Sequence, residues 1–126
     1  MSRSGPKGVF RGKRVLILED EPIIAIDLEL ELEDAGAVVA RAETTAEARS
    51  VIREALPDAA VLDYSLMSHR TAEPVAEELD KRGVPYIFYS GDLDRHGEAI
   101  SRFGRPVIAK PAPARDVLDA LAKLVL

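Results

Sequence analysis

The chain has 126 residues, a net charge of −5 and no cysteine. Its length fits one compact domain with one hydrophobic core. The absence of cysteine excludes disulfides, thiolate zinc sites and cysteine nucleophiles. No apolar run approaches the roughly 20 residues of a membrane-spanning helix, and the first residues lack the apolar stretch of a secretory signal. We therefore expect a cytoplasmic protein that does not insert into a membrane.

The first 14 residues differ in charge from the rest of the chain, because they hold basic side chains and no acid. The remainder is strongly acidic, and an acidic body without a basic face offers no footprint for DNA or RNA. The Ser, Gly and Pro content of the N-terminal segment is typical of a frayed chain end. We expect residues 1–13 to form a flexible basic leader and residues 14–126 to form the domain.

The apolar runs and helix signals alternate along the chain. In order, they predict strand 15–18, helix 22–35, strand 37–41, helix 45–56, strand 59–62, helix 72–82, strand 85–89, a short or irregular helix within 91–105, strand 106–109 and helix 113–125. Short, continuously apolar strands between helices indicate a parallel sheet that is covered on both faces. The expected fold is a three-layer α/β sandwich with five parallel strands in the order 2-1-3-4-5, as in flavodoxin-like proteins.

Part of the helix predicted over residues 22–35 has a pattern typical of a strand. Residues 26–33 alternate apolar and acidic side chains, as a half-buried strand would. Leu and Glu are strong helix formers, which favours the helix. The apolar residues also form a broad stripe at helical spacing. The members of the stripe are Ile23, Ile24, Ile26, Leu28, Leu30, Leu32 and Ala35. We expect the leucines of this helix to pack into the core rather than to form a dimer seam.

Polar residues follow four of the predicted strands at the point where each strand ends. Glu19 and Asp20 follow the first strand, Asp63 the third, Ser90 the fourth and Lys110 the fifth. In open α/β sheets ligands bind at the carboxyl ends of the strands, beside the point where the strand order reverses. In the order 2-1-3-4-5 the first and third strands are neighbours at that point, so the three carboxylates would meet in one crevice.

Three carboxylates that lie this close must hold a proton or bind a cation at neutral pH. Magnesium is the natural cation, because it prefers carboxylate and water oxygens and leaves positions for substrate phosphate. Lys110 would neutralise an anionic oxygen, and Ser90 would donate a hydroxyl hydrogen bond. Together these residues indicate a phosphoryl-binding site in which Asp63 is the nucleophile.

Four segments resemble the motifs of response regulator receiver domains, the CheY-like modules of two-component signalling. They are Val15-Leu-Ile-Leu-Glu-Asp-Glu-Pro22, Val61-Leu-Asp63, Tyr89-Ser-Gly91 and Lys110-Pro111. The resemblance spans nearly the whole chain. It implies a signalling module rather than an enzyme. Because no output domain follows Leu126, we expect a single-domain, stand-alone receiver.

The resemblance also implies a role for each matched residue. Asp63 would accept the phosphoryl group, with Ser90 and Lys110 acting on it. Mg²⁺, or Mn²⁺ in its place, would be held by the carboxylates and by the backbone carbonyl of Ser65; these carboxylates are Glu19, Asp20 and Asp63.

The expected partners of such a module are other proteins. The phosphodonor would be a sensor histidine kinase or a histidine phosphotransfer protein, and the output would pass by contact to an unknown downstream protein. We expect a monomer or a weak homodimer.

Two features depart from the family pattern and one suggests a subgroup. Val107 lies where the family usually has an aromatic residue that moves on phosphorylation, and the loop after Asp63 lacks the common Pro-Gly pair. Phe88-Tyr-Ser-Gly91 is similar to the Phe-Ala-Thr-Gly motif of stand-alone receivers common in alphaproteobacteria.

The sequence is compatible with two alternative functions. One is a degenerate receiver that acts as a scaffold without phosphorylation. Val107 supports this alternative, because it replaces the aromatic residue that usually moves on phosphorylation. The other is a small phosphatase of the haloacid-dehalogenase type, which also uses a magnesium-bound aspartate nucleophile. Such phosphatases carry a second aspartate two residues after the nucleophile, where this chain has Ser65.

Overall fold

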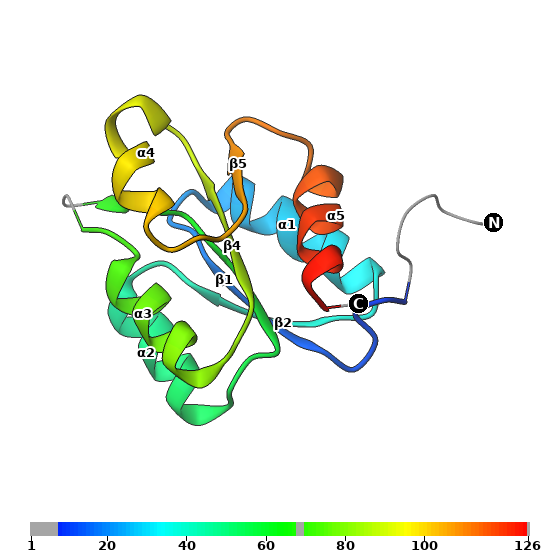
Figure 1. Cartoon of the computed structure of the whole chain (residues 1–126). Coiled ribbons are helices and arrows are strands. Elements are labelled where there is room, and N and C mark those ends of the chain that lie inside the picture. Colours follow the sequence, from blue (N-terminus) through cyan, green and yellow to red (C-terminus); the bar gives the residue numbers. More distant parts are fainter. Residues whose placement is uncertain (1–7, 68–69, 126) are drawn as a thin grey trace.

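A computed structural model describes residues 8–67 and 70–125. These residues form one sheet of five parallel strands with helices on both faces (Figure 1). The strands are β1 (Arg14–Leu18), β2 (Val38–Ala42), β3 (Ala59–Leu62), β4 (Tyr86–Ser90) and β5 (Val107–Ala109). The helices are α1 (Pro22–Asp34), α2 (Thr45–Glu54), α3 (Glu73–Arg82), α4 (Leu93–Ser101) and α5 (Ala114–Val125).

The strand order is β2-β1-β3-β4-β5, which confirms the predicted topology. The predicted strands and long helices agree with the observed ones to within two residues at each end. The fourth helix is short, as predicted, but regular over its 9 residues. It begins after Asp92, whose φ of 52° is in the left-handed region.

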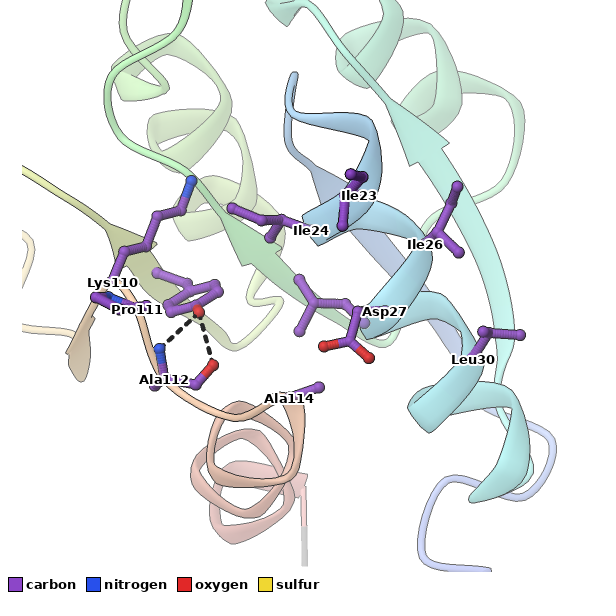
Figure 2. A pocket seen from close by; sticks show the side chains of 11 residues that line it. Ile23, Ile24, Ile26, Asp27, Leu30, Lys110, Pro111, Ala112 and Ala114 are labelled. Carbon is purple, nitrogen blue, oxygen red and sulfur yellow. Dashed lines mark hydrogen bonds between the residues drawn. The ribbon is translucent and has the colours of Figure 1, made fainter.

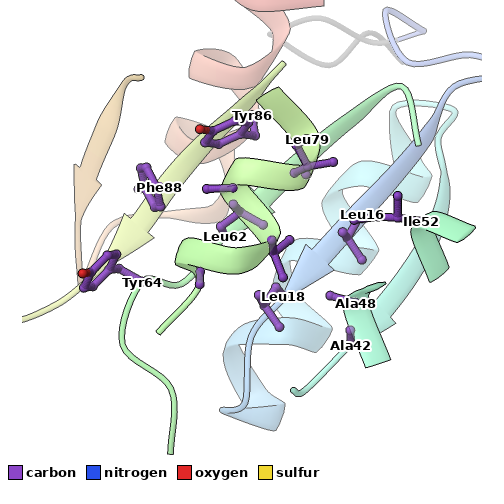
Figure 3. Packing of buried hydrophobic residues seen from close by; sticks show 14 of the residues in the cluster. Leu16, Leu18, Ala42, Ala48, Ile52, Leu62, Tyr64, Leu79, Tyr86 and Phe88 are labelled. Carbon is purple, nitrogen blue, oxygen red and sulfur yellow. The ribbon is translucent and has the colours of Figure 1, made fainter. Parts of the chain in front are cut away.

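The sheet separates two apolar cores. Val15 and Ile17 of β1 face α1 and α5, whereas Leu16 and Leu18 face α2 and α3. This alternation follows from the period of two along a strand. The second core also takes Tyr86 and Phe88 from β4, and it is drawn in Figure 3. Since β1, β3 and β4 are buried on both faces, their sequences are apolar apart from Arg14 at the start of β1 and Ser90 at the end of β4.

Helix α1 buries a narrower stripe than predicted. Leu28 and Leu32 are at most 2% exposed, as expected of core residues. Leu30 is instead 60% exposed, so its predicted burial is wrong. Ile23 and Ile26 of the same apolar stripe are 83% and 45% exposed. The cause is geometric: residues two apart on a helix lie about 200° apart around its axis, so Leu28 and Leu30 cannot both face the sheet.

The predicted N-terminal leader falls partly outside the described residues, which begin at Gly8. From there the chain forms a turn against the end of α1. Phe10 is fully buried between α1 and the sheet, and its N–H donates to the carbonyl of Ala35 at 3.3 Å. Packing of the domain therefore begins before Arg14, while the flexibility of residues 1–7 stays a prediction.

Candidate functional site

Backbone hydrogen bonds place the predicted site residues at one edge of the sheet. The Asp63 N–H donates to the Leu18 carbonyl at 2.9 Å, which fixes the end of β3 beside the end of β1. The Lys110 N–H donates to the Ser90 carbonyl at 3.0 Å and fixes β5 beside β4 in the same way. The parallel register thus brings together the four strand ends from which the functional side chains project.

The three predicted carboxylates meet in this crevice. Glu19, Asp20 and Asp63 each offer an oxygen within 4.8 Å of the others. Glu19 and Asp63 are buried, and Asp20 is half-buried. One Asp20 oxygen accepts the backbone N–H of Met67 at 2.7 Å, which ties the loop after β3 to the acidic group.

Two donors bind the two carboxylate oxygens of Asp63. The Ser90 hydroxyl donates to Oδ1 at 2.8 Å, and the Lys110 ammonium donates to Oδ2 at 3.2 Å. Lys110 also contacts Glu19 Oε1 at 2.9 Å and Glu21 Oε1 at 3.1 Å. The residues at the carboxyl ends of β1, β3, β4 and β5 therefore form one network of charge-assisted hydrogen bonds.

Burial and charge act against each other in this network. Burial, together with the charge of Asp63, raises the pKa of Glu19 from 4.5 to about 7, despite the opposing hydrogen bond from Lys110. Burial and the charge of Asp20 also raise the pKa of Asp63. Burial lowers the pKa of Lys110, but the hydrogen bond to Glu19 and the charges of Asp63 and Glu19 outweigh it, so this pKa lies above its ordinary value. The site thus favours a bound cation.

The chemistry of the donor set fits a magnesium ion. All three side chains offer hard carboxylate oxygens. Burial, and then neighbouring negative charge, raises the pKa values of Glu19 and Asp63, and a bound cation would offset both effects. A small cavity of about 200 Å³ opens onto Asp63, Ser90 and Lys110. Ser65, which was predicted to offer its backbone carbonyl, also lines this cavity.

A larger cavity of about 440 Å³ lies next to the site, between α1 and the segment after β5 (Figure 2). Its lining is mostly apolar and includes the exposed Ile23, Ile26 and Leu30 of α1. Tyr89 also lines this cavity. Its hydroxyl is held in place because it donates to the Ala112 carbonyl at 2.9 Å and accepts from the Ala112 N–H at 3.0 Å.

Comparison with solved structures found proteins that cover most of this chain, whereas no family model and no curated protein matched it. SdrG from Sphingomonas melonis Fr1 is 39% identical, with 90% of this chain and 97% of that chain aligned at a TM-score of 0.74. The CheY-like response regulator receiver domain protein of Methanospirillum hungatei JF-1 is 26% identical over 90% and 93% of the two chains, with a TM-score of 0.79. This chain belongs to the response regulator receiver domains.

The receiver fold also occurs within longer chains. The anti-anti-sigma factor PhyR of Bartonella quintana is 28% identical at a TM-score of 0.72, but the match covers 90% of the present chain and only 48% of PhyR. Five parallel strands in the order 2-1-3-4-5 agree with the flavodoxin-like, CheY-like fold of these neighbours. The comparisons do not favour the phosphatase alternative.

One residue of the receiver site was missed by sequence reasoning. Glu21 lines the small cavity and binds Lys110, yet only Glu19 and Asp20 were chosen from the acidic run. The sequence did hold a signal for Glu21, because this residue comes directly after Glu19 and Asp20 at the end of β1. What the sequence lacks is the direction of each side chain.

In the part of the receiver that the structure describes, no helix combines the length and apolar character needed to cross a bilayer.

Proposed function

We propose that this receiver domain accepts a phosphoryl group on Asp63 from the phosphohistidine of a sensor histidine kinase or a histidine phosphotransfer protein. The observation that carries the proposal is the pair of donors on the Asp63 carboxylate. Ser90 contacts one oxygen and Lys110 the other, and the carboxylates of Glu19 and Asp20 lie close to Asp63. This arrangement combines a nucleophile with groups that bind phosphoryl oxygens.

In the proposed step an Asp63 oxygen forms a bond to phosphorus while the bond from phosphorus to the histidine nitrogen breaks. The imidazole, with a proton on its other ring nitrogen, keeps the electron pair of that bond and leaves as a neutral ring. The Ser90 hydroxyl and the Lys110 ammonium would bind the phosphoryl oxygens, since both already reach the Asp63 carboxylate. Because Ser90 and Lys110 bind different oxygens of the Asp63 carboxylate, they would orient this nucleophile before the phosphodonor arrives.

The residues that would hold Mg²⁺, or Mn²⁺ in its place, are Glu19, Asp20, Asp63 and the backbone carbonyl of Ser65. When bound, the ion would neutralise charge on the transferring phosphoryl group. Glu19 is buried and accepts both from Lys110 and from the Glu21 N–H at 3.1 Å, so it is held in place by the protein.

The same proposal covers the place of the protein in signalling. Output would pass to a downstream protein by direct contact, in the cytoplasm. Membership of the Phe-Ala-Thr-Gly subgroup and a monomeric or weakly dimeric state stay predictions.

Phosphotransfer profiling with a panel of phosphorylated kinases and phosphotransfer proteins would identify the donor by its fast labelling of this chain.

Replacing the nucleophile tests the proposal. Purified protein is incubated with magnesium and a phosphodonor, either acetyl phosphate or a phosphorylated kinase, and intact-mass spectrometry measures the added phosphoryl group. Wild type is expected to gain it, and Asp63→Asn to lose it completely, because an amide is a poor nucleophile. The label is expected to be cleaved by hydroxylamine, as an acyl phosphate is.

The matched control is Asp94→Asn, which makes the same change on an exposed side chain of α4. It is expected to be labelled like wild type. Equal labelling of the Asp63 variant and wild type would refute the proposal, and a wild type that no donor labels would favour the phosphorylation-independent scaffold.

A further inference from the structure

Lys110 has a carboxylate partner for every proton of its ammonium group. An ammonium carries three N–H donors. The carboxylates of Glu19, Glu21 and Asp63 lie 2.9, 3.1 and 3.2 Å from its nitrogen. A phosphoryl oxygen that comes to Lys110 must therefore displace one of the three.

Glu21 is the partner that leaves most easily. Its side chain is 62% exposed, whereas those of Glu19 and Asp63 are 2% and 6% exposed. An exposed carboxylate regains water as soon as it lets go of the ammonium, so an exposed ion pair contributes little net stability. A buried carboxylate has no such replacement and stays.

Glu21 also stands where a donor must enter. It lines the small cavity together with Asp63, Ser90 and Lys110. Its backbone is fixed, because its N–H donates to Glu19 and the next residue is Pro22 at the start of α1. The side chain alone is therefore free to move between the ammonium and the solvent.

We propose that Glu21 is a specificity-determining residue that selects phosphodonors by their charge. The inference rests on the proposed phosphorylation of Asp63. A small donor with two negative charges is repelled by the Glu21 carboxylate and competes with it for Lys110. A donor whose phosphoryl group is bonded to a protonated nitrogen carries less net negative charge and is repelled less.

Two small donors separate this charge effect from general reactivity. Acetyl phosphate is a dianion at neutral pH: Asp63 forms its bond to phosphorus as the phosphorus–oxygen bond breaks, and acetate leaves. Phosphoramidate has a protonated nitrogen and a net charge of −1: the phosphorus–nitrogen bond breaks, and ammonia leaves. Both reactions place the same group on the same atom.

The experiment measures the rate constant of phosphorylation for wild type and Glu21→Gln, with each donor at low ionic strength and saturating magnesium. Since repulsion scales with donor charge, the variant is expected to react about tenfold faster with acetyl phosphate and about threefold faster with phosphoramidate. The ratio between these two factors is the readout. It should approach one in high salt, which screens an exposed charge.

Glu33→Gln is the matched control, because it removes the same charge from an exposed position at the other end of α1. It is expected to leave both rate constants unchanged. Equal factors for the two donors, or no change in Glu21→Gln, would overturn the inference while phosphorylation of Asp63 stands. If neither donor labels wild type, the proposed function itself fails.

Discussion

Two carboxylates of the site, Glu19 and Asp63, are buried in an environment that disfavours their charged forms. Glu19 is buried beside Asp63, and neither has enough opposite charge around it to offset the loss of water, although both share Lys110. The raised pKa of Glu19 is the result. These buried charges lower the stability of the folded domain, and they are also the groups that would bind a cation and an anionic group. Such a conflict between stability and binding is common at functional sites.

This placement predicts how stability depends on pH. The pKa of Glu19 rises from 4.5 to about 7 on folding, so its favourable contribution is fully present below pH 4.5 and is lost as pH rises through 7. Without divalent ions, the free energy of unfolding of wild type is expected to fall by on the order of 2 kcal/mol between about pH 5 and pH 8. Glu19→Gln, which stays neutral, should show a much smaller fall.

Urea unfolding at the two pH values, in the presence of a chelator, measures this difference. Glu33→Gln serves as the control for removal of a surface carboxylate and should follow wild type. A Glu19→Gln variant that loses as much stability between the two pH values as wild type would show that Glu19 does not set the pH dependence.

The sequence predicted the strands better than the buried faces of the helices. Continuous apolar runs determine β1, β3 and β4 because both sides of these strands are buried. In α1 the sequence holds more apolar residues than one face can bury, so pattern alone does not separate Leu28 from Leu30. The site itself was predicted from strand ends, since the parallel register brings them to one edge.

The two leucines of α1 give a direct test of this assignment. Leu28 is 2% exposed and Leu30 is 60% exposed. Leu28→Ala is expected to lower the free energy of unfolding by about 2–5 kcal/mol, because it leaves a cavity between α1 and the sheet. Leu30→Ala should change it by less than about 0.5 kcal/mol. Chemical unfolding of both variants at one pH measures the pair, and similar values would contradict the orientation of α1.

Some contacts between elements could not be read from the sequence. Tyr64 follows Asp63, and its buried side chain donates a hydrogen bond to Glu73 of α3 and contacts the ring of His96 in α4 with a centroid distance of 5.1 Å. No motif marks this link, because it depends on how the loop after β3 turns. The exposure of Val107, at 39%, likewise depends on the position of β5 at the edge.

At the scale of the whole molecule, negative charge gathers at the carboxyl edge of the sheet, where the carboxylates of Glu19, Asp20 and Asp63 converge. A ligand that binds only the folded state stabilises it by mass action. Magnesium at a hundred times its dissociation constant is therefore expected to raise the free energy of unfolding by about 2.7 kcal/mol. Asp20→Asn should lose most of this gain.

Thermal unfolding with magnesium and with chelator measures the effect, and Asp94→Asn should keep it. An equal rise of the melting temperature in wild type and in Asp20→Asn would place the cation elsewhere. The experiment also tests magnesium binding separately from phosphorylation.

The shortness of β5 affects how copies of this domain can associate. Open edge strands are templates for joining one sheet to another. Here the edge strand has only 3 residues and lies between Pro106 and Pro111, which have no N–H to donate. A second chain would find few backbone groups to pair with along this edge. The β5 edge of the sheet is thus protected from edge-to-edge pairing, and a partner that meets this side must recognise side chains.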